Sequence, residues 1–251
     1  MGFEFILSGA VGGLLVGMTG VGGGSLMTPL LIAGFGIAPS NAIGTDLVYA
    51  ALTKAGAVVC HHRQRNVAWG TAGWLLSGSL PGCLLTMVVL HHLHPGPDLN
   101  GFLRHVLSLT LAGTALALWQ RKSVSVAPTT ARSPLWTPVL GFLIGVLVTL
   151  SSVGGGALGT ALLLALYPAY PFARVVGTEL AHAVPLTLVA GLGHWHLGHV
   201  DTALLVSLLI GSLPGLWLGT KLNHRLPEQV ARRGLTLLLL GLAVVLWQSP
   251  A

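Results

Sequence analysis

Residues 151–156 read Ser-Ser-Val-Gly-Gly-Gly, a glycine run inside an otherwise apolar stretch. The Val-Gly-Gly-Gly part also stands at residues 21–24, 132 positions earlier. Two more landmarks repeat in the same order at an offset of 133: Gly-Thr-Asp at 44–46 with Gly-Thr-Glu at 177–179, and Gly-Ser-Leu-Pro-Gly at 78–82 and again at 211–215. The repeat unit is far longer than a solenoid repeat. Two long, glycine-interrupted apolar halves are typical of secondary transporters, whose site lies where the halves meet.

The composition indicates a membrane protein. Only 7% of the residues are charged and 53% are hydrophobic, whereas soluble domains are roughly 25% charged. The mean hydropathy is +0.82. A soluble core of this size needs a charged shell that the chain cannot build. Spans are expected at residues 42–60, 69–90, 102–119, 175–193, 202–222 and 234–247, since a crossing takes about 20 apolar residues.

Several other classes of protein are excluded or disfavoured by the sequence. The net charge of +6 is modest and sits in short loops, so it reflects membrane topology and not a nucleic-acid surface. The two cysteines make no disulfide framework and match no metal spacing. No phosphate-binding loop of the ATPase type is present. We find no enzyme constellation, and we expect no cofactor.

The basic residues predict the orientation of the loops. Lys and Arg favour the cytoplasmic side, and they gather at residues 61–68, 120–137 and 221–233. These loops are therefore expected inside, and the loops at 91–101 and 194–201 outside. Loops 61–68 and 194–201 are repeat equivalents on opposite sides, which predicts that the two halves are inverted relative to each other.

Inversion requires an odd number of crossings in each half, so the segments 1–36 and 138–170 must each add an even number. A helix over such a segment is about 50 Å long, too long for one straight crossing. Each segment is expected to form a helical hairpin that bends at the glycine run and either spans the bilayer or re-enters it. Both chain ends then lie outside. One crossing per segment is the alternative, and it places residues 221–233 outside.

The predicted fold is an all-α polytopic membrane protein with two inverted structural repeats. Each repeat holds a glycine-broken helical hairpin and three transmembrane helices. The first repeat covers residues 1–119, a cytoplasmic linker covers 120–137, and the second repeat covers 138–251.

The paired motifs resemble the TauE/SafE sulfite exporter family over nearly the whole chain. The resemblance rests on the Val-Gly-Gly-Gly break with Pro29 after it, on the Gly-Thr-Asp motif about 20 residues later, and on Gly-Thr-Glu in the second half. It implies a multi-pass bacterial inner-membrane transporter that exports small sulfur-containing anions such as sulfite or sulfonates. The second half departs from the pattern, because the equivalent of Pro29 is Ala161.

The glycine runs are candidates for an anion cradle. Glycine leaves the backbone N–H groups unshielded, and a helix that begins after the break offers free donors and a positive dipole end. The alternative is that these glycines serve only close packing or a hinge. The Thr45 and Thr178 hydroxyls either bind the anion or bond their own helix. The expected lining residues are Thr19, Gly22, Gly23, Gly24, Ser25, Thr45, Lys54, Ser151, Ser152, Gly154, Gly155, Gly156 and Thr178.

Lys54 is a basic residue well inside an expected span, and its repeat equivalent is Thr187. An ionisable side chain at that depth is costly and usually faces a cavity or a partner. We expect it to attract the substrate. Two alternatives stay open: Lys54 snorkels to the inner headgroups, or it pairs with Asp46 on the same helix face.

Three further residues are candidates for proton coupling. Asp46 and Glu179 are equivalent acids after Gly-Thr, and the alternative is that they cap their helices. His182 is the equivalent of Tyr49, and it is either a relay or a satisfied packing residue. An exporter of anions from a negative-inside cell also needs no proton.

A metal-cation transporter is the competing function. It would use the outer histidines, which are His91, His92, His94, His194, His196 and His199. Their spacing matches no strong zinc signature, so no metal site is assigned. A third interpretation is a structural or sensory membrane protein that transports nothing. Broken helices argue against it, because irregular backbone inside the membrane is tolerated mainly around a cavity. The expected partners are a small anion, lipid and, as an option, a second copy in a homodimer, with no nucleic acid.

Overall fold

The computed structural model describes residues 2–19, 26–93, 97–120, 136–223 and 228–248. Within these residues the chain is all α-helical, without a strand. The helices are α1 Phe3–Thr19, α2 Met27–Phe35, α3 Pro39–Arg63, α4 Trp69–His92, α5 Pro97–Gln120, α6 Trp136–Ser151, α7 Ala157–Leu166, α8 Phe172–His196, α9 Thr202–Asn223 and α10 Glu228–Gln248. Five of them, α3, α4, α5, α8 and α9, are long and apolar enough to cross a bilayer. The prediction of an all-α polytopic membrane protein is confirmed.

The repeat is visible in the helix boundaries. Helix α3 and helix α8 each hold 25 residues, and their first residues, Pro39 and Phe172, are 133 positions apart. Helices α4 and α9 also begin 133 positions apart, at Trp69 and Thr202. Each half therefore has the same order, which is a broken helix pair followed by three helices.

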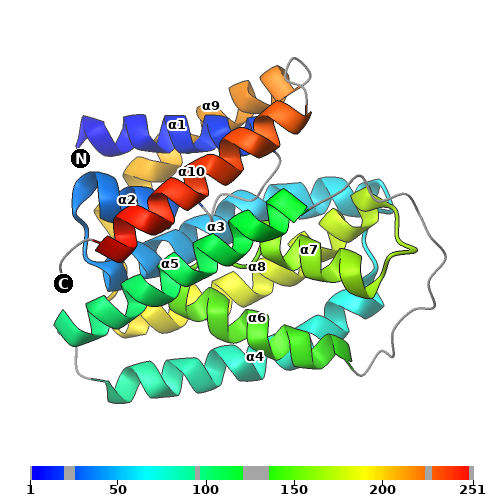
Figure 1. Ribbon diagram of the computed structural model, residues 1–251, viewed down its shortest axis with the longest axis horizontal. Helices are drawn as coiled ribbons and strands as arrows, with labels where there is room; N and C mark the ends of the chain where they lie inside the picture. Colours follow the sequence, from blue (N-terminus) through cyan, green and yellow to red (C-terminus); the bar gives the residue numbers. More distant parts are fainter. Residues whose placement is uncertain (1, 20–25, 94–96, 121–135, 224–227, 249–251) are drawn as a thin grey trace.

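The broken pairs turn back within the molecule. Helix α6 runs inward and α7 runs back toward the side from which α6 came (Figure 1). Helices α2 and α7 hold 9 and 10 residues, so each is only about 15 Å long or less. That is about half of the hydrocarbon thickness. This length favours hairpins that re-enter the bilayer over hairpins that span it.

Reciprocal packing relates the two halves. Helix α1 packs against α9 of the other half, and its equivalent α6 packs against α4. Glycines spaced four residues apart line both crossings, and a β-carbon on any of them would collide with the facing backbone. Such spacing lets membrane helices approach closely. The glycine pairs are Gly9 and Gly13 with Gly211 and Gly215 at the α1–α9 crossing, and Gly141 and Gly145 with Gly78 and Gly82 at the α4–α6 crossing.

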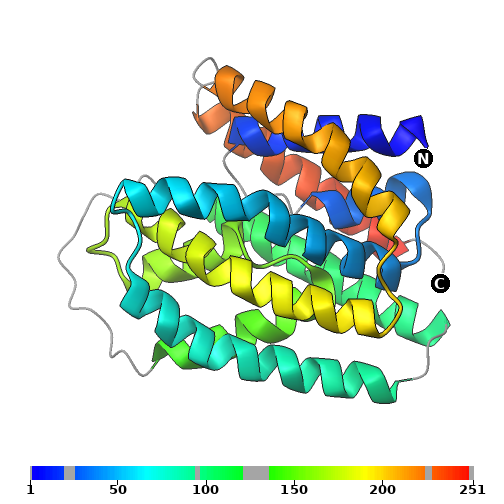
Figure 2. The same cartoon turned by 180° about the vertical axis from the view of Figure 1, so that it is seen from behind.

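Equivalent helices run in opposite directions. The backbone N–H of Ala68, after α3, donates to Thr178 Oγ1 near the start of α8, at 2.9 Å. In the matching contact, the N–H of Asp201, after α8, donates to Thr45 Oγ1 near the start of α3, at 3.0 Å. Figures 1 and 2 show α3 and α8 side by side and antiparallel. Inverted repeats require this relation, and the orientation of each half in a membrane stays a prediction.

Helices α3 and α8 form the centre of the bundle. Residues 42–51 of α3 are buried without interruption, so no face of this segment meets the surroundings. By contrast α4, α5, α9 and α10 carry large apolar side chains that are about half exposed, among them Trp74, Leu109, Trp217 and Leu237. A surface of this kind suits lipid and not water.

Candidate functional site

Lys54 reaches the tip of the second broken hairpin. Its side chain is 4% exposed, and Nζ donates a 2.5 Å hydrogen bond to the carbonyl oxygen of Gly155. Burial at the hairpin tip rules out snorkelling. No hydrogen bond joins Lys54 to Asp46, but the two groups are close enough to interact electrostatically, so the pairing alternative stays open. The ammonium therefore lies where α3 meets the break between α6 and α7.

The tip of this hairpin has an unusual backbone. Ser152 has φ 56° and Gly154 has φ 128°, values in the left-handed region that favours glycine. The hydroxyl of Ser151 accepts the N–H of Val153 at 3.2 Å and steadies the turn. Helix α7 begins directly after it at Ala157, so its first N–H groups and positive dipole end lie beside the turn.

Asp46 joins both hairpins to α3. Its Oδ2 accepts hydrogen bonds from Thr28 Oγ1 of α2 at 2.5 Å and from Ser152 Oγ at 3.0 Å. Its Oδ1 is buried without a hydrogen-bond partner in the described part of the chain. The capping alternative is wrong for Asp46, because the residue at the N-cap of α3 is Ala38. This carboxyl group instead holds the two broken elements against the central helix.

Glu179 occupies the equivalent place on α8 but has a different environment. It is 2% exposed, and its Oε1 finds no hydrogen-bond donor among the residues that the structure describes. The capping alternative is wrong here too, since Pro171 is at the N-cap of α8. Its carboxyl group faces the backbone of Gly155 and Gly159. A buried carboxyl oxygen without a donor calls for a proton, a water molecule or a ligand.

His182 lies next to this group of charges. Its Nε2 shares a 2.9 Å hydrogen bond with the hydroxyl of Ser79 on α4. The equivalent pair in the other half is Tyr49 and Ser212, whose side chains also interact. Because Lys54 is close enough to act electrostatically on His182, this imidazole belongs to the edge of the site.

Thr45 and Thr178 do not reach the charged cluster. Thr178 Oγ1 donates to the carbonyl oxygen of Arg174 at 2.6 Å and accepts the N–H of Ala68. Thr45 Oγ1 accepts the N–H of Asp201. Thr178 thus bonds its own helix, as one alternative foresaw, and both hydroxyls anchor the loop of the opposite half. Neither is placed to bind an anion beside Lys54.

The first hairpin tip is only partly described. Gly22, Gly23, Gly24 and Ser25 lie outside the described residues. Thr19 ends α1, and its side chain lies outside the description as well. The prediction that these residues line the cradle stays a prediction.

The outer histidines fall into two groups. His194 and His199 are buried, and their Nδ1 atoms lie 3.3 Å apart. His194 Nε2 also bonds the carbonyl oxygen of Thr149 at 3.0 Å. His91, His92 and His196 are exposed, and His94 lies outside the described residues. No group of three metal-binding side chains occurs among the residues described.

Three residues near Lys54, Asp46 and Glu179 were not predicted from the sequence as site residues. Thr28 binds Asp46, while Ser79 and Tyr49 belong to the symmetric His182–Ser79 and Tyr49–Ser212 contacts. A signal for Ser79 was present, because both copies of the Gly-Ser-Leu-Pro-Gly motif keep the serine. Thr28 recurs as Thr160 at the 132-residue offset. The repeat could therefore have identified both residues.

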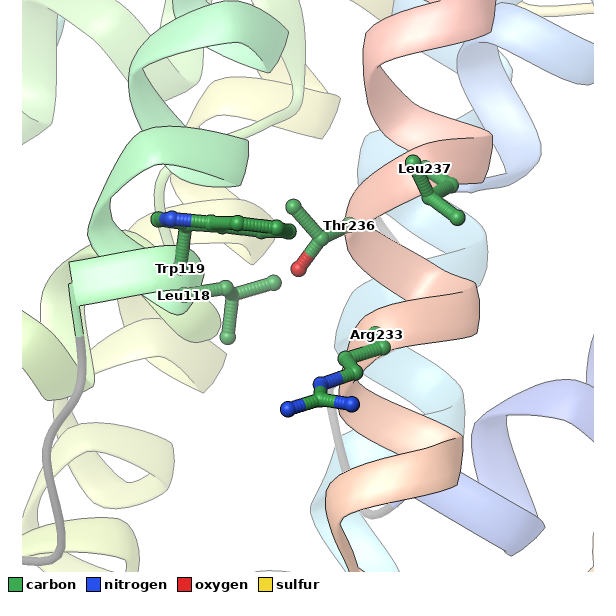
Figure 3. A pocket seen from close by; sticks show the side chains of 5 residues that line it. All are labelled: Leu118, Trp119, Arg233, Thr236 and Leu237. Carbon is green, nitrogen blue, oxygen red and sulfur yellow. The ribbon is translucent and has the colours of Figure 1, made fainter.

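A separate surface pocket lies between α5 and α10. It is lined by Leu118, Trp119, Arg233, Thr236 and Leu237 (Figure 3). The indole of Trp119 extends toward Thr236, and the Arg233 side chain lies below them in the view. Exposed Trp and Arg side chains at helix ends are typical of the membrane–water interface. This pocket shares no residue with the Lys54 cluster.

Comparisons with known proteins identify the family of the chain. The family described as "Sulfite exporter TauE/SafE" matches residues 5–246. The chain is 36% identical over 235 residues to "Probable membrane transporter protein YjnA" of Bacillus subtilis (strain 168), covering 90% of this chain and 91% of that protein. It is 28% identical over 236 residues to "Probable membrane transporter protein YdhB" of the same organism, with 90% and 91% covered. No solved structure matches.

Proposed function

The chain belongs to the TauE/SafE sulfite exporter family, and we propose that this membrane transporter exports small sulfur-containing anions, such as sulfite or sulfonates, across the bacterial inner membrane. Transport is secondary, driven by gradients and not by ATP. The anion binds where the tip of the second hairpin meets Lys54.

The observation that carries the proposal is the buried ammonium of Lys54 on the carbonyl oxygen of Gly155. An ammonium has three N–H donors, and one is used by this bond. A charged lysine at the centre of a membrane helix costs about 2.5–3.5 kcal/mol on insertion scales. A chain that retains such a charge beside a broken helix supplies a site for a negative ligand.

The helix dipole adds to this attraction. The N-terminus of α7 follows Gly155 and Gly156 directly, so its positive end lies beside the ammonium. A sulfonate or sulfite group carries oxygen acceptors that suit backbone and ammonium donors alike. The neutral backbone donors set the shape of the site, and the charge of Lys54 gives the site its preference for anions.

The antiparallel halves suit alternating access. Helices α1 and α9, and helices α6 and α4, form two equivalent crossings on glycine-lined surfaces. Rocking of one such unit against the other opens the central site to one side at a time. The potential of a negative-inside cell favours export of an anion that moves alone, by about 2.3 kcal/mol per charge for each 100 mV.

The test is a substrate panel on purified protein in liposomes. We expect outward flux of radiolabelled sulfite, or of a sulfonate, that exceeds the flux from protein-free liposomes and is abolished by Lys54→Met. Zinc and nickel ions form the competing arm. Flux of either metal without flux of any sulfur anion would reject the proposal in favour of the metal-cation transporter.

A further inference from the structure

Lys54 and Glu179 face the same small space at the second hairpin tip. A β-carbon at position 155 would lie 3.6 Å from Glu179 Oε1, 3.7 Å from Lys54 Nζ and 3.4 Å from Ala183 Cβ. These are ordinary van der Waals distances, so the space accepts one atom the size of a methyl group or an oxygen. The structure shows no ion pair between the two charged groups. The space therefore separates an ammonium from a carboxyl group.

Both groups have unused hydrogen-bonding capacity on this space. Lys54 donates one of its three N–H groups to Gly155 and has no second acceptor in the described part of the chain. Glu179 Oε1 is likewise without a donor there. An oxyanion oxygen placed between them accepts a hydrogen bond from Lys54 and also lies against the carboxyl group of Glu179. A carboxylate repels it, whereas a carboxyl group that carries a proton donates a hydrogen bond to it.

No other ionisable group around Glu179 in the described part of the chain is placed to donate a hydrogen bond to the oxyanion in place of a protonated Glu179. Helices α3, α4, α6 and α7 pack against α8, and α6 and α7 carry no ionisable side chain. Helix α4 contributes Cys83 and, at its far end, two exposed histidines. On α3, His61 lies at the helix end, and Asp46 is engaged by two hydroxyls. His182 on α8 is bonded to Ser79.

Lys54 is therefore the charge that controls Glu179. In the empty site burial disfavours the charged form of Glu179, whereas the ammonium of Lys54 favours it. When an oxyanion binds the ammonium of Lys54, the positive charge is shared between the oxyanion and Glu179. The Glu179 carboxylate then lies next to a second negative charge. The balance then shifts toward a protonated Glu179, so that anion and proton bind together.

On the premise of the proposed function, we propose that Glu179 binds one proton together with each oxyanion, so that the anion and the proton move as a neutral pair. Methanesulfonate and hydrogen sulfite are both monoanions, so each forms a neutral pair only with the proton on Glu179. The membrane potential then adds nothing to the flux, and the concentration and pH gradients set its direction.

The experiment uses the full chain in liposomes with methanesulfonate, which stays a monoanion over the pH range tested, and with sulfite as a second anion. A trapped pH dye follows protons, and a potassium ionophore sets the potential. We expect one proton to move with each methanesulfonate, no response to the potential, and a flux that falls up to tenfold per pH unit once Glu179 loses its proton.

Glu179→Gln separates the proton from the anion. The amide keeps a permanent N–H donor toward the oxyanion, so the variant should move methanesulfonate without a proton, with no pH dependence and with a new response to the potential. Retention of wild-type proton movement in this variant overturns the role of Glu179.

Gly155→Ala tests the space itself. Its methyl group fits at ordinary contact distances, so the variant should fold, while anion flux is lost. The control is Gly56→Ala on α3, where a β-carbon meets nothing within 4 Å. Equal flux in the two alanine variants overturns the inference. If the wild type moves either anion without a proton, the inference fails and the proposed function stands. If it moves neither anion, the proposed function fails and this inference fails with it.

Discussion

Replacement of Lys54 by Met should abolish transport while leaving the fold nearly as stable as before. Met keeps much of the stem volume but removes the ammonium. The lost hydrogen bond to Gly155 costs about 1.5–3 kcal/mol, the range for bonds that involve a charged group. Release of a buried charge returns about 2.5–3.5 kcal/mol on insertion scales. The two effects largely offset each other, so the unfolding free energy is expected to change by between about −0.5 and +2 kcal/mol.

The effect on the anion has no such compensation. A bound oxyanion loses a charge-assisted hydrogen bond of about 1.5–3 kcal/mol, which corresponds to a fall in affinity of about 10- to 150-fold. Lys54→Arg should retain part of the function, because the charge remains in a different donor geometry. The dependence of flux on anion concentration in liposomes measures the apparent affinity, and thermal unfolding of the same preparations measures stability.

A double variant distinguishes a substrate site from a structural pair. Because Asp46 is bonded to Thr28 and Ser152 and not to Lys54, adding Asp46→Asn to Lys54→Met should not restore flux. Wild-type affinity in the single variant, or recovery of flux in the double variant, would refute the placement of Lys54 in the anion site.

Three more outcomes follow from the fold. Single cysteines at Arg65 and His196, both exposed, in a background without the native cysteines, should be labelled from inside and outside respectively, and labelling from one common side would contradict inverted halves. Gly145→Val should unfold at a much lower temperature than Gly113→Val, since a β-carbon at 145 collides with the facing backbone whereas one at 113 meets nothing; equal stability would contradict the close helix crossing. Thr178→Val should lose about 1–3 kcal/mol of stability, because it removes two neutral hydrogen bonds, with flux retained; loss of flux at unchanged stability would return Thr178 to the anion site.

The sequence predicted most of the spans because membrane helices leave a strong signal; the exception is the span expected at 234–247, which is not among the five helices long and apolar enough to cross. Twenty apolar residues are needed for each crossing, and helix α4, observed at Trp69–His92, was expected at 69–90. The repeat also located the two broken segments, because glycine runs interrupt helices for a simple conformational reason. The reciprocal packing of α1 on α9 was not predicted, since periodicity alone does not state which helix faces which.

The site was harder to predict because its contacts join residues far apart in the chain. Lys54 was identified as costly in a span, but its partner, Gly155, lies 101 positions away. Asp46 was expected to couple protons or to cap. It binds hydroxyls from both hairpins and does not cap α3, and its coupling role stays a prediction. Thr45 and Thr178 were expected near the anion, and they anchor loops instead. The type of a residue indicates which interactions its side chain can make, and the fold determines which residue it contacts.

Binding of sulfite by the purified protein tests most directly whether an oxygen of the anion occupies the space between Lys54 and Glu179 at the second hairpin tip. A ligand that binds the folded state raises thermal stability with its concentration. We predict that rising sulfite concentrations stabilise the wild type and Gly56→Ala alike and leave Gly155→Ala unchanged. Equal stabilisation of Gly155→Ala would contradict this location for the anion.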